Sequence, residues 1–455
     1  MRNISILTVL IATLFLSSCA SNNTYRYKTD EPCVVKDKVH CADSSIQKHN
    51  LEGKEYSLGF VEIDDQGQFR DNREQLNALI KELESTPENE RLIITVFVHG
   101  WHHNAKEGDP NIESFKNGLD SLVGDYKKLE FEREKKEKAS GEIKQHKKTK
   151  IFGVYVGWRG DSIKVPYLKE VTFWDRKNTA ENVGYVALSE LLLRLEKVKN
   201  DRNSAEINKE KSANNRLVII GHSFGGAAVY QSTSQILASR FMLSGQKMDA
   251  KTMSYNKTIK GIGDLVVLIN PAFEAIRYAP LFDIAQAQCV YEREQKPELI
   301  ILTSVNDSAT KTLFPLGRFF STALETHDVV KRDDCNFPVT YRESKADNTA
   351  VGHYEPLQTH QLKLTDTSGE KGNLWQAYDD INCNWKSQKN GESISFGSTE
   401  LKSLSKTVER NPYLNIKVDA EIIKDHNDIF GGNLLDFLKV ATYLSTDSEC
   451  SEKIK

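Results

Sequence analysis

The sequence predicts an α/β protein with a mostly parallel central sheet and helices on both faces of that sheet. Three observations predict this class. Short apolar runs rich in β-branched residues recur along the chain, as expected for strands that are buried on both faces. Segments with apolar residues at helical spacing separate these runs, and this alternation favours parallel strands joined by right-handed crossovers. Residues 216–230 (RLVIIGHSFGGAAVY) also pass from strand to sharp turn to helix.

Strands and helices are expected to alternate from residue 57 to residue 303. Continuous apolar runs predict the strands, and Asp65-Gln66-Gly67 predicts a hairpin turn within the first of them. The expected strands are residues 57–69, 91–98, 151–158, 217–220, 265–269 and 299–303. The expected helices are residues 75–84, 112–126, 180–197 and 273–286. Each of these helices lies between two strands, where a crossover is needed.

The periodic pattern loosens after residue 307 and returns near the end of the chain. Residues 308–415 are polar and irregular, and we interpret them as an insertion or cap. A strand at residues 415–424 and a helix at 434–444 then complete the core. The prediction is therefore a core over 51–307, an insertion over 308–415 before the last strand, and a return to the core over 416–455.

The N-terminal residues have the pattern of an export signal. Arg2 gives a positive start, and residues 4–16 are apolar but too few to span a bilayer. Leu16-Ser17-Ser18-Cys19 follows and resembles the lipobox of a bacterial lipoprotein signal peptide. The resemblance implies cleavage after residue 18, lipidation of Cys19 and a bacterial cell-envelope location, in the outer membrane if the host is Gram-negative. An ordinary secretory signal and a transmembrane anchor are the alternatives.

Cysteine usage agrees with an exported chain. Besides Cys19, six cysteines remain, and an even number in an exported protein predicts disulfides. They are Cys33, Cys41, Cys289, Cys335, Cys383 and Cys450. Closeness in the sequence favours only the pair Cys33–Cys41, which would lie within a polar tether over residues 19–50. No Cys-x-x-Cys or His-x-x-x-His spacing occurs, so we expect no structural zinc.

The charge of the chain gives no electrostatic argument for binding to nucleic acid or to an anionic membrane surface. Its net charge is −3, with 27% charged and 39% hydrophobic residues, as in ordinary globular proteins. Residues 130–150 are dense in lysine and glutamate, and we interpret them as a solvated helix extension or exposed insertion. A basic docking patch is the alternative, but acidic residues are interspersed throughout this segment.

The turn Gly221-His222-Ser223-Phe224-Gly225 carries the chemistry that we expect. A strand that reverses into a helix within so few residues leaves no room for side chains on either side of the apex, which explains the glycines. The turn raises the Ser223 hydroxyl above the sheet, next to the backbone N–H groups that begin the helix. A glycine-rich turn around a buried serine is the alternative. In this setting GHSFGG resembles the nucleophile elbow of α/β-hydrolases.

That resemblance implies a Ser-Asp-His order for the catalytic triad, which can be tested along the chain. Asp307 follows the strand at 299–303, where the acid is expected, although it could instead cap a turn. Asp283, Asp333 and Asp334 are weaker candidates. Four of the eleven histidines follow Ser223 in the chain, namely His327, His353, His360 and His426. His426 lies between the resumed strand and the closing helix and is the expected base, with His353 as the runner-up.

An oxyanion hole is expected from two backbone N–H groups. Phe224 directly follows the nucleophile, and His99-Gly100-Trp101 follows a buried strand and resembles the HG-type oxyanion motif of the family. We therefore assign these two positions to Phe224 and Trp101. His102-His103-Asn104 could suggest a metal, but adjacent histidines point apart and a third ligand is not evident, so we expect neither metal nor cofactor.

These features together resemble a group of bacterial α/β-hydrolases of esterase or lipase type. The resemblance covers about residues 92–307 and 420–438, including Phe173-Trp174-Asp175 and the NDSAT segment that contains the acid. It implies a lipid-anchored serine hydrolase that cleaves ester bonds, with lipid esters and thioesters included. An acyltransferase with the same triad and an envelope-anchored binding protein on this scaffold are the alternatives. The substrate head group, the acyl length, the oligomeric state and a lid role for 308–415 stay open.

Overall fold

The computed structural model describes residues 23–36, 39–51, 53–141, 148–161, 173–207, 215–244, 248–249, 254–255, 258–315, 318, 325–365 and 374–446. The sheet strands among these residues are β1 (Cys33–Val35), β2 (Ile46–Leu51), β3 (Lys54–Glu62), β4 (Glu90–Val98), β5 (Lys148–Gly157), β6 (Arg216–His222), β9 (Leu265–Ile269), β10 (Leu299–Ser304), β13 (His360–Leu364), β14 (Ser393–Phe396), β15 (Thr399–Ser403) and β16 (Tyr413–Val418).

Within the described residues, these twelve strands form one sheet. Their order across it is β1-β2-β3-β5-β4-β6-β9-β10-β16-β13-β15-β14. Every neighbouring pair from β3 to β13 is parallel, whereas β2 is antiparallel to β3 and β15 is antiparallel to β13 and β14. The predicted α/β class with a mostly parallel sheet is therefore confirmed. The apolar runs form the centre of the sheet, where both faces are buried.

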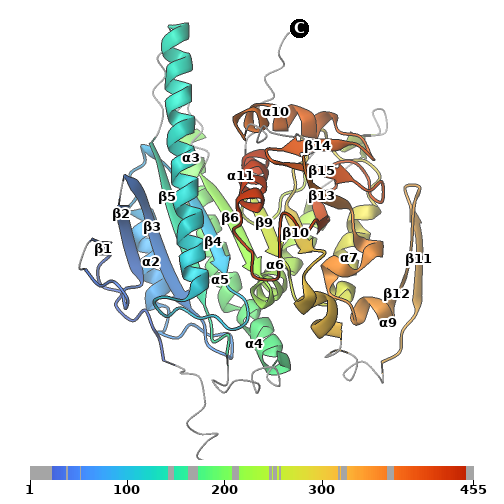
Figure 1. Ribbon diagram of the computed structural model, residues 1–455, viewed down its shortest axis with the longest axis horizontal. Helices are drawn as coiled ribbons and strands as arrows, with labels where there is room; N and C mark the ends of the chain where they lie inside the picture. Colours follow the sequence, from blue (N-terminus) through green and yellow to red (C-terminus); the bar gives the residue numbers. More distant parts are fainter. Residues whose placement is uncertain are drawn as a thin grey trace, which may run out of the picture.

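Helices cover both faces of the sheet (Figure 1). They are α2 (Glu74–Glu84), α3 (Pro110–Ser140), α4 (Phe173–Tyr185), α5 (Ala187–Ile207), α6 (Phe224–Leu243), α7 (Ala275–Gln286), α9 (Glu343–Asp347), α10 (Leu374–Ser387) and α11 (Gly432–Thr446). One apolar core joins the sheet to α2, α4, α5, α6 and α7. A second core, on the opposite face, joins it to α3, α10 and α11. Alternate residues of each central strand contribute to the two cores.

Three expected elements differ in the structure. The strand expected at 57–69 is β3, which ends at Glu62 and is followed only by an isolated bridge between Ile63 and Phe69. The helix expected at 180–197 is two helices, because α4 ends at Tyr185 and α5 begins at Ala187. The break follows Gly184, which packs so closely on α6 that an added Cβ would lie 2.3 Å from the carbonyl oxygen of Ala228. The strand expected at 415–424 ends at Val418, because the carbonyl of Asp419 accepts the N–H of Ile422 and closes a turn.

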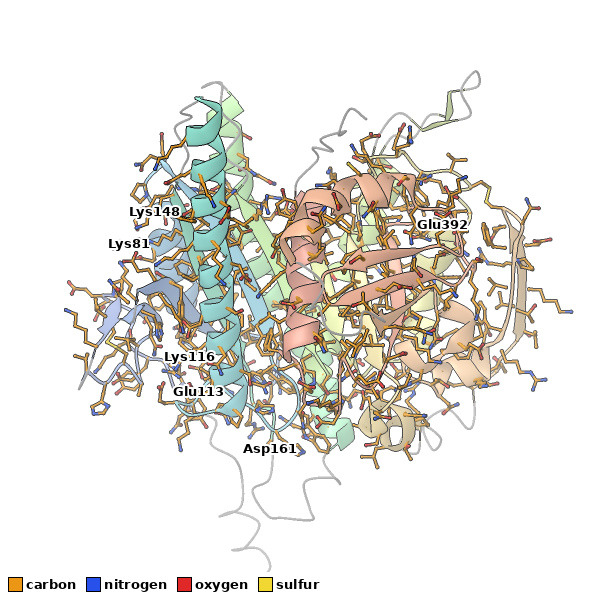
Figure 2. The ribbon with its side chains drawn as sticks, turned by 45° about the horizontal axis from the view of Figure 1, so that its top comes forward. Lys81, Glu113, Lys116, Lys148, Asp161 and Glu392 are labelled. Carbon is orange, nitrogen blue, oxygen red and sulfur yellow. A yellow bond between two sulfur atoms is a disulfide. The ribbon has the colours of Figure 1, made fainter. Side chains whose placement is uncertain are left out.

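The charged segment after residue 130 continues α3 as a helix to Ser140 (Figure 1). Up to Ser140 this segment is therefore a helix extension, one of the two forms that we expected, whereas its last residues, 148–150, begin strand β5. The last turns of α3 extend beyond the sheet as a single helix. Acidic and basic side chains both occur along α3. Near its start, Lys116 pairs with Glu113 at 2.9 Å (Figure 2).

We expected a tether over residues 19–50, but the described part of this segment packs on the core. β1 and β2 form one side of the sheet, and the favoured disulfide Cys33–Cys41 is present. Arg26 is fully buried, with its guanidinium 4.1 Å from the centre of the Phe60 ring and its Nε donating to the carbonyl of Ala105 at 2.8 Å. Polar side chains at a sheet edge leave no apolar repeat in the sequence, which explains why the pattern predicted no strand.

The 308–415 insertion extends the sheet instead of forming a wholly separate layer. Its strands β13, β15 and β14 continue the sheet beyond β16. A separate hairpin of β11 (Val329–Asp334) and β12 (Phe337–Arg342) joins the end of α7 through the disulfide Cys289–Cys335. A short pair, β7 (Met248–Asp249) and β8 (Ser254–Tyr255), follows α6. The last core strand, β16, thus lies between β10 and the inserted strands.

The carboxyl ends of the parallel strands all lie along one edge of the sheet. Figure 2 labels both ends of β5, with Lys148 at its start and Asp161 shortly after its end, on opposite sides of the molecule. The ends of β4, β6, β10 and β16 lie along the same edge as Asp161 because these strands are parallel. The predicted site residues follow these strand ends.

Candidate functional site

Ser223 lies at the apex of the turn between β6 and α6. Its φ of 54° and ψ of −121° are a strained conformation for a residue with a side chain. The backbone holds this conformation with three hydrogen bonds: the N–H of Ser223 donates to the carbonyl of Ile269 at 3.0 Å, and its own carbonyl accepts from Ala227 and Ala272. Ser223 is 4% exposed, so only a small part of it reaches the solvent.

The glycines on either side of Ser223 are required by close packing. An added Cβ at Gly225 would lie 2.2 Å from the carbonyl oxygen of Val98 at the end of β4. At Gly221 it would lie 2.7 Å from the carbonyl oxygen of Gly225. Both obstacles are backbone atoms, which cannot move aside as a flexible side chain can. The sequence reasoning about this turn therefore agrees with the geometry.

The structure brings Ser223, His426 and Asp307 into one hydrogen-bonded chain. His426 Nε2 lies 2.8 Å from Ser223 Oγ, and His426 Nδ1 lies 2.8 Å from Asp307 Oδ1. The three residues come from the ends of β6 and β10 and from the loop between β16 and α11. Such an arrangement lets a neutral imidazole accept the proton of the hydroxyl while the carboxylate fixes the ring and its tautomer.

Asp307 is fully buried and held as a carboxylate. Its Oδ1 also accepts from the backbone N–H groups of Ala309 at 3.0 Å and Thr310 at 3.2 Å, and its Oδ2 accepts from the Thr310 hydroxyl. Burial alone raises the pKa of Asp307, but the hydrogen bonds from His426 and Thr310 outweigh it and hold the pKa below its usual range. The acid is therefore ionised at neutral pH.

The loop that carries His426 is anchored by residues from two other strands. His222 Nε2 lies 2.8 Å from the carbonyl oxygen of His426, and Asn270 Nδ2 donates to the same oxygen at 3.1 Å. Asn270 Oδ1 accepts from the N–H of Ser304 at 3.0 Å, which ties the end of β10 to the same loop. Burial holds the pKa of His222 well below its ordinary value, so its ring is neutral and Nε2 is the donor.

Sequence reasoning missed Asn270 and the anchoring role of His222. Asn270 has a φ of 45°, in the left-handed region that asparagine tolerates better than most residues. A polar residue directly after the buried run 265–269 was the available signal, since such positions lie at the carboxyl edge of a parallel sheet.

The other acid and base candidates lie elsewhere. Asp283 is paired with Arg332 at 3.3 Å, and Asp333 and Asp334 lie in the β11–β12 hairpin. His360 is buried within β13, where its Nδ1 bonds Thr359, and His327 lies 3.6 Å from Asp347. His353 does not bond Ser223. Its Nε2 lies 2.9 Å from Thr310 Oγ1, which bonds the oxygen of Asp307 that does not face His426.

The loop after β4 lies directly beside Ser223. An added Cβ at Gly100 would lie 2.9 Å from Ser223 Cβ, so only glycine permits this approach. The ring of Trp101 lies 6.0 Å from the ring of Phe224, the first residue of α6. The two residues assigned to the oxyanion hole thus lie on backbone segments that meet at Ser223.

The histidines after Trp101 bond separate carboxylates. His102 Nδ1 lies 2.5 Å from Asp161 Oδ1, and His103 Nδ1 lies 2.9 Å from Asp109 Oδ1. Elsewhere among the described residues, Glu325, His327 and Asp347 bring possible metal-ligating atoms within 4.8 Å of one another. Asp347 also pairs with Arg318 at 2.5 Å, so ion pairs account for much of this cluster.

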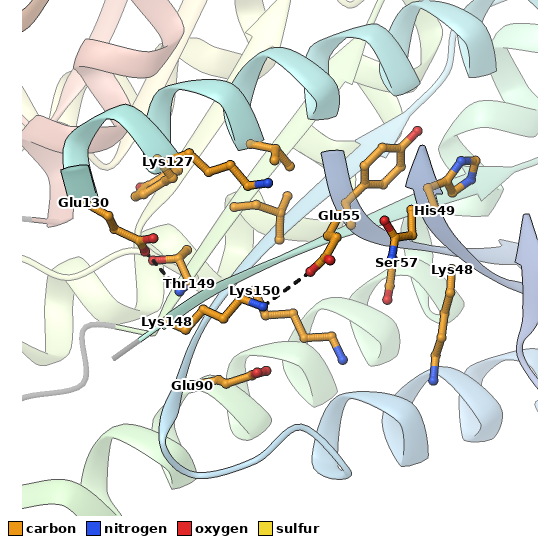
Figure 3. Close-up of a pocket in the computed structure, with 15 residues that line it drawn as sticks. Lys48, His49, Glu55, Ser57, Glu90, Lys127, Glu130, Lys148, Thr149 and Lys150 are labelled. Carbon is orange, nitrogen blue, oxygen red and sulfur yellow. Dashed lines mark hydrogen bonds and ion pairs between the residues drawn. The ribbon is translucent and has the colours of Figure 1, made fainter. Parts of the chain in front are cut away.

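A pocket of about 290 Å³ lies at the opposite edge of the sheet, near the start of β5 (Figure 3). Lysines and glutamates alternate around it. They are Lys48, Lys127, Lys148, Lys150, Glu55, Glu90 and Glu130. Lys148 pairs with Glu55 at 3.3 Å, and Glu130 accepts the N–H of Thr149 at 3.1 Å (Figure 3). The position of this pocket separates it from the hydrogen-bonded chain at Ser223.

Comparisons with protein-family models, with curated proteins and with solved structures found no match. Among the described residues, no helix is both long and apolar enough to cross a membrane. Cys19 and the expected signal peptide lie outside the described residues, as does Cys450.

Proposed function

We propose that this chain is a serine hydrolase with an α/β-hydrolase fold that cleaves carboxylic esters through an acyl-enzyme. The observation that carries the proposal is the chain Ser223–His426–Asp307, with both hydrogen bonds at 2.8 Å. The order of the triad along the chain and the strand–turn–helix setting of Ser223 support the fold assignment. The buried, ionised acid gives His426 the environment that a general base requires.

The proposed mechanism uses only residues of this chain. Ser223 Oγ attacks the ester carbonyl carbon as its proton passes to His426 Nε2, and the backbone N–H groups of Phe224 and Trp101 bind the developing oxyanion. The carbon–oxygen bond to the alcohol then breaks, and His426 returns the proton to the leaving oxygen. Water, deprotonated by His426, attacks the acyl-enzyme, and the carboxylic acid is released as Ser223 regains its proton. Asp307 stays ionised throughout.

The proposed setting is the bacterial cell envelope, with the chain held to a membrane by a lipid on Cys19. The pattern of residues 1–19 supports this, together with the disulfides Cys33–Cys41 and Cys289–Cys335, which are typical of exported proteins. A lipid or other small ester at the membrane surface would be the corresponding substrate.

The test is labelling of the full-length chain in detergent micelles with a fluorophosphonate, which reacts with activated serines. Wild type is expected to label, and Ser223→Ala and His426→Ala are expected to lose labelling. Ser232→Ala is the matched control because Ser232 is also a buried serine, on the helix that follows Ser223, and its hydroxyl donates to a backbone carbonyl. Labelling that persists in Ser223→Ala, or that is absent from folded wild type, would overturn the proposal.

A further inference from the structure

The hydrogen-bonded chain that begins at Ser223 does not end at Asp307. Asp307 Oδ2 accepts from the hydroxyl of Thr310, and Thr310 Oγ1 lies 2.9 Å from His353 Nε2. A second histidine therefore lies behind the acid, on the side opposite His426. Thr310 is 1% exposed and Asp307 is fully buried, so water does not compete for the bonds between them.

The direction of each proton in this extension follows from the chemistry of the groups. An ionised carboxylate can only accept, so the single hydroxyl proton of Thr310 must point to Asp307. The hydroxyl oxygen then has only lone pairs to offer His353, so Nε2 of His353 must carry a proton and donate. The order is His353 to Thr310 to Asp307.

His353 is a neutral donor in this arrangement. Burial lowers the pKa of His353 to about 4, against the opposing influence of Asp307 and with the help of the nearby charge of Lys311. A neutral imidazole has one N–H, and the bond to Thr310 places it on Nε2. His353 thus polarises the Thr310 hydroxyl without placing a full positive charge behind the acid.

Both donors are held by rigid backbone. Thr310 lies in a π-helical turn (Ala309–Leu313), a rare conformation that occurs often at functional sites. His353 ends a short 3₁₀ turn (Val351–His353) whose carbonyl at Val351 accepts from the buried Asn415 at 3.1 Å. The middle of that turn, Gly352, approaches Thr303 so closely that an added Cβ would lie 1.7 Å from Thr303 Oγ1.

We propose that Thr310 and His353 are positioning residues that orient the Asp307 carboxylate and disperse its charge, acting in series from the insertion. The proposal rests on the proposed function, because it assigns these residues to the same reaction. Because Thr310 and His353 lie within residues 308–415, the insertion would contribute side chains to the proton transfer between Ser223 and His426. The runner-up base candidate, His353, would act on the acid instead of on the serine.

The test pairs each disruptive variant with a conservative one. Thr310→Val removes the hydroxyl at constant shape, whereas Thr310→Ser keeps it; His353→Leu removes the ring N–H, whereas His353→Gln keeps a donor. Thr310→Val is expected to lower kcat/KM for an activated ester roughly 10-fold, as for one lost hydrogen bond to a charged group. The acid limb of its pH–rate profile is expected to move to higher pH, because a carboxylate with fewer donors holds the imidazolium more strongly.

His353→Leu is expected to shift the profile in the same direction, and both conservative variants are expected to stay near wild type. The double variant Thr310→Val/His353→Leu should match Thr310→Val alone, since the two residues act in series. Thr233→Val is the matched control: it removes an equally buried hydroxyl, bonded to the Val229 carbonyl at 2.7 Å, on α6. Its pH profile should not move.

The inference fails if Thr310→Val and Thr233→Val behave alike, or if the double variant shows the sum of the two single effects. These outcomes would leave the proposed function standing as long as wild type hydrolyses the ester. A readout independent of activity is the low-field proton resonance of the His426 Nδ1–H, assigned by its loss in Asp307→Asn. Should wild type prove inactive, a shift of this resonance in Thr310→Val would still support the positioning role, and its constancy would overturn it.

Discussion

At the scale of single residues, the site depends on side chains that hold backbone in place. The carbonyl oxygen of His426 accepts two hydrogen bonds, from His222 and Asn270. These bonds fix the backbone of the loop, so that the His426 side chain lies in position to bond Ser223. Asn270 serves two partners at once, because its other amide atom accepts from Ser304 at the end of β10. One fully buried side chain therefore aligns both the acid-bearing strand and the base-bearing loop.

We predict that Asn270→Gly lowers both stability and activity. Glycine adopts the φ of 45° without strain, so the variant isolates the loss of the side chain. Leaving the N–H of Ser304 without its partner should cost roughly 1–3 kcal/mol of unfolding free energy. A looser His426 loop should lower kcat about 10-fold or more at nearly unchanged KM. Chemical denaturation and ester kinetics check this prediction, and a variant that loses stability but keeps full kcat would contradict it.

The three residues of the hydrogen-bonded chain could be predicted from the sequence, because each follows a strand that is buried on both faces of the sheet. Ser223, Asp307 and His426 could be placed by strand ends and by their order along the chain. Asn270, Thr310 and His353 could not be assigned roles in the same way. Their contacts are made by loops and turns that have no recognisable motif, such as the irregular turn that carries Thr310, and for Asn270 the sequence showed only a polar residue at the end of a strand.

At the scale of elements, apolar composition decides which strands could be predicted. The central strands β4, β5, β9 and β10 were expected within a few residues of their bounds, because burial on both faces leaves continuous apolar runs. β1, β2 and the inserted strands at the other side are short and carry more polar side chains, so their pairing is visible only in three dimensions. The disulfide partners Cys289 and Cys335, 46 residues apart, were equally hidden.

We predict that the disulfides Cys33–Cys41 and Cys289–Cys335 contribute unequally to stability. Loop-closure entropy gives about 4 kcal/mol for the 46-residue separation of Cys289 and Cys335, against about 2.5 kcal/mol for the 8-residue separation of Cys33 and Cys41. The double variants Cys289→Ser/Cys335→Ser and Cys33→Ser/Cys41→Ser should therefore lose free energy of unfolding in that order. Urea denaturation of both against wild type measures the difference. A reversed order would show that contacts in the folded state, and not the length of the closed loop, determine how much each disulfide contributes to the free energy of unfolding.

At the scale of the whole molecule, buried histidines couple folding to pH. Burial lowers the pKa of His49, His99, His353 and His360 to about 4 and that of His222 well below its ordinary value. In the unfolded chain these rings titrate near pH 6.5. Between about pH 4 and 6.5 the unfolded state therefore holds protons that the folded state does not. These histidines therefore make stability rise with pH across this window, whereas Glu298, whose pKa burial raises to about 8, opposes part of this rise.

We predict that His360→Gln flattens this dependence. His360 is 5% exposed within β13, and its removal takes away one of the lowered titrations. The slope of unfolding free energy against pH should decrease by up to about 1.4 kcal/mol per pH unit between pH 4.5 and 6. His40→Gln, at an exposed position, is the control and should keep the wild-type slope. Equal slopes for wild type and His360→Gln would contradict the prediction.

The place of β16 in the sheet has a consequence for the order in which this protein matures. β16 lies between β10 and β13, both of which precede it in the chain, so it must enter a gap between two strands already made. The loop with His426 follows directly after it. In a chain that is still being synthesised, Ser223 therefore lacks the His426 partner with which it bonds in the folded protein. Under the proposed mechanism, Ser223 would become reactive only after β16 has entered the sheet.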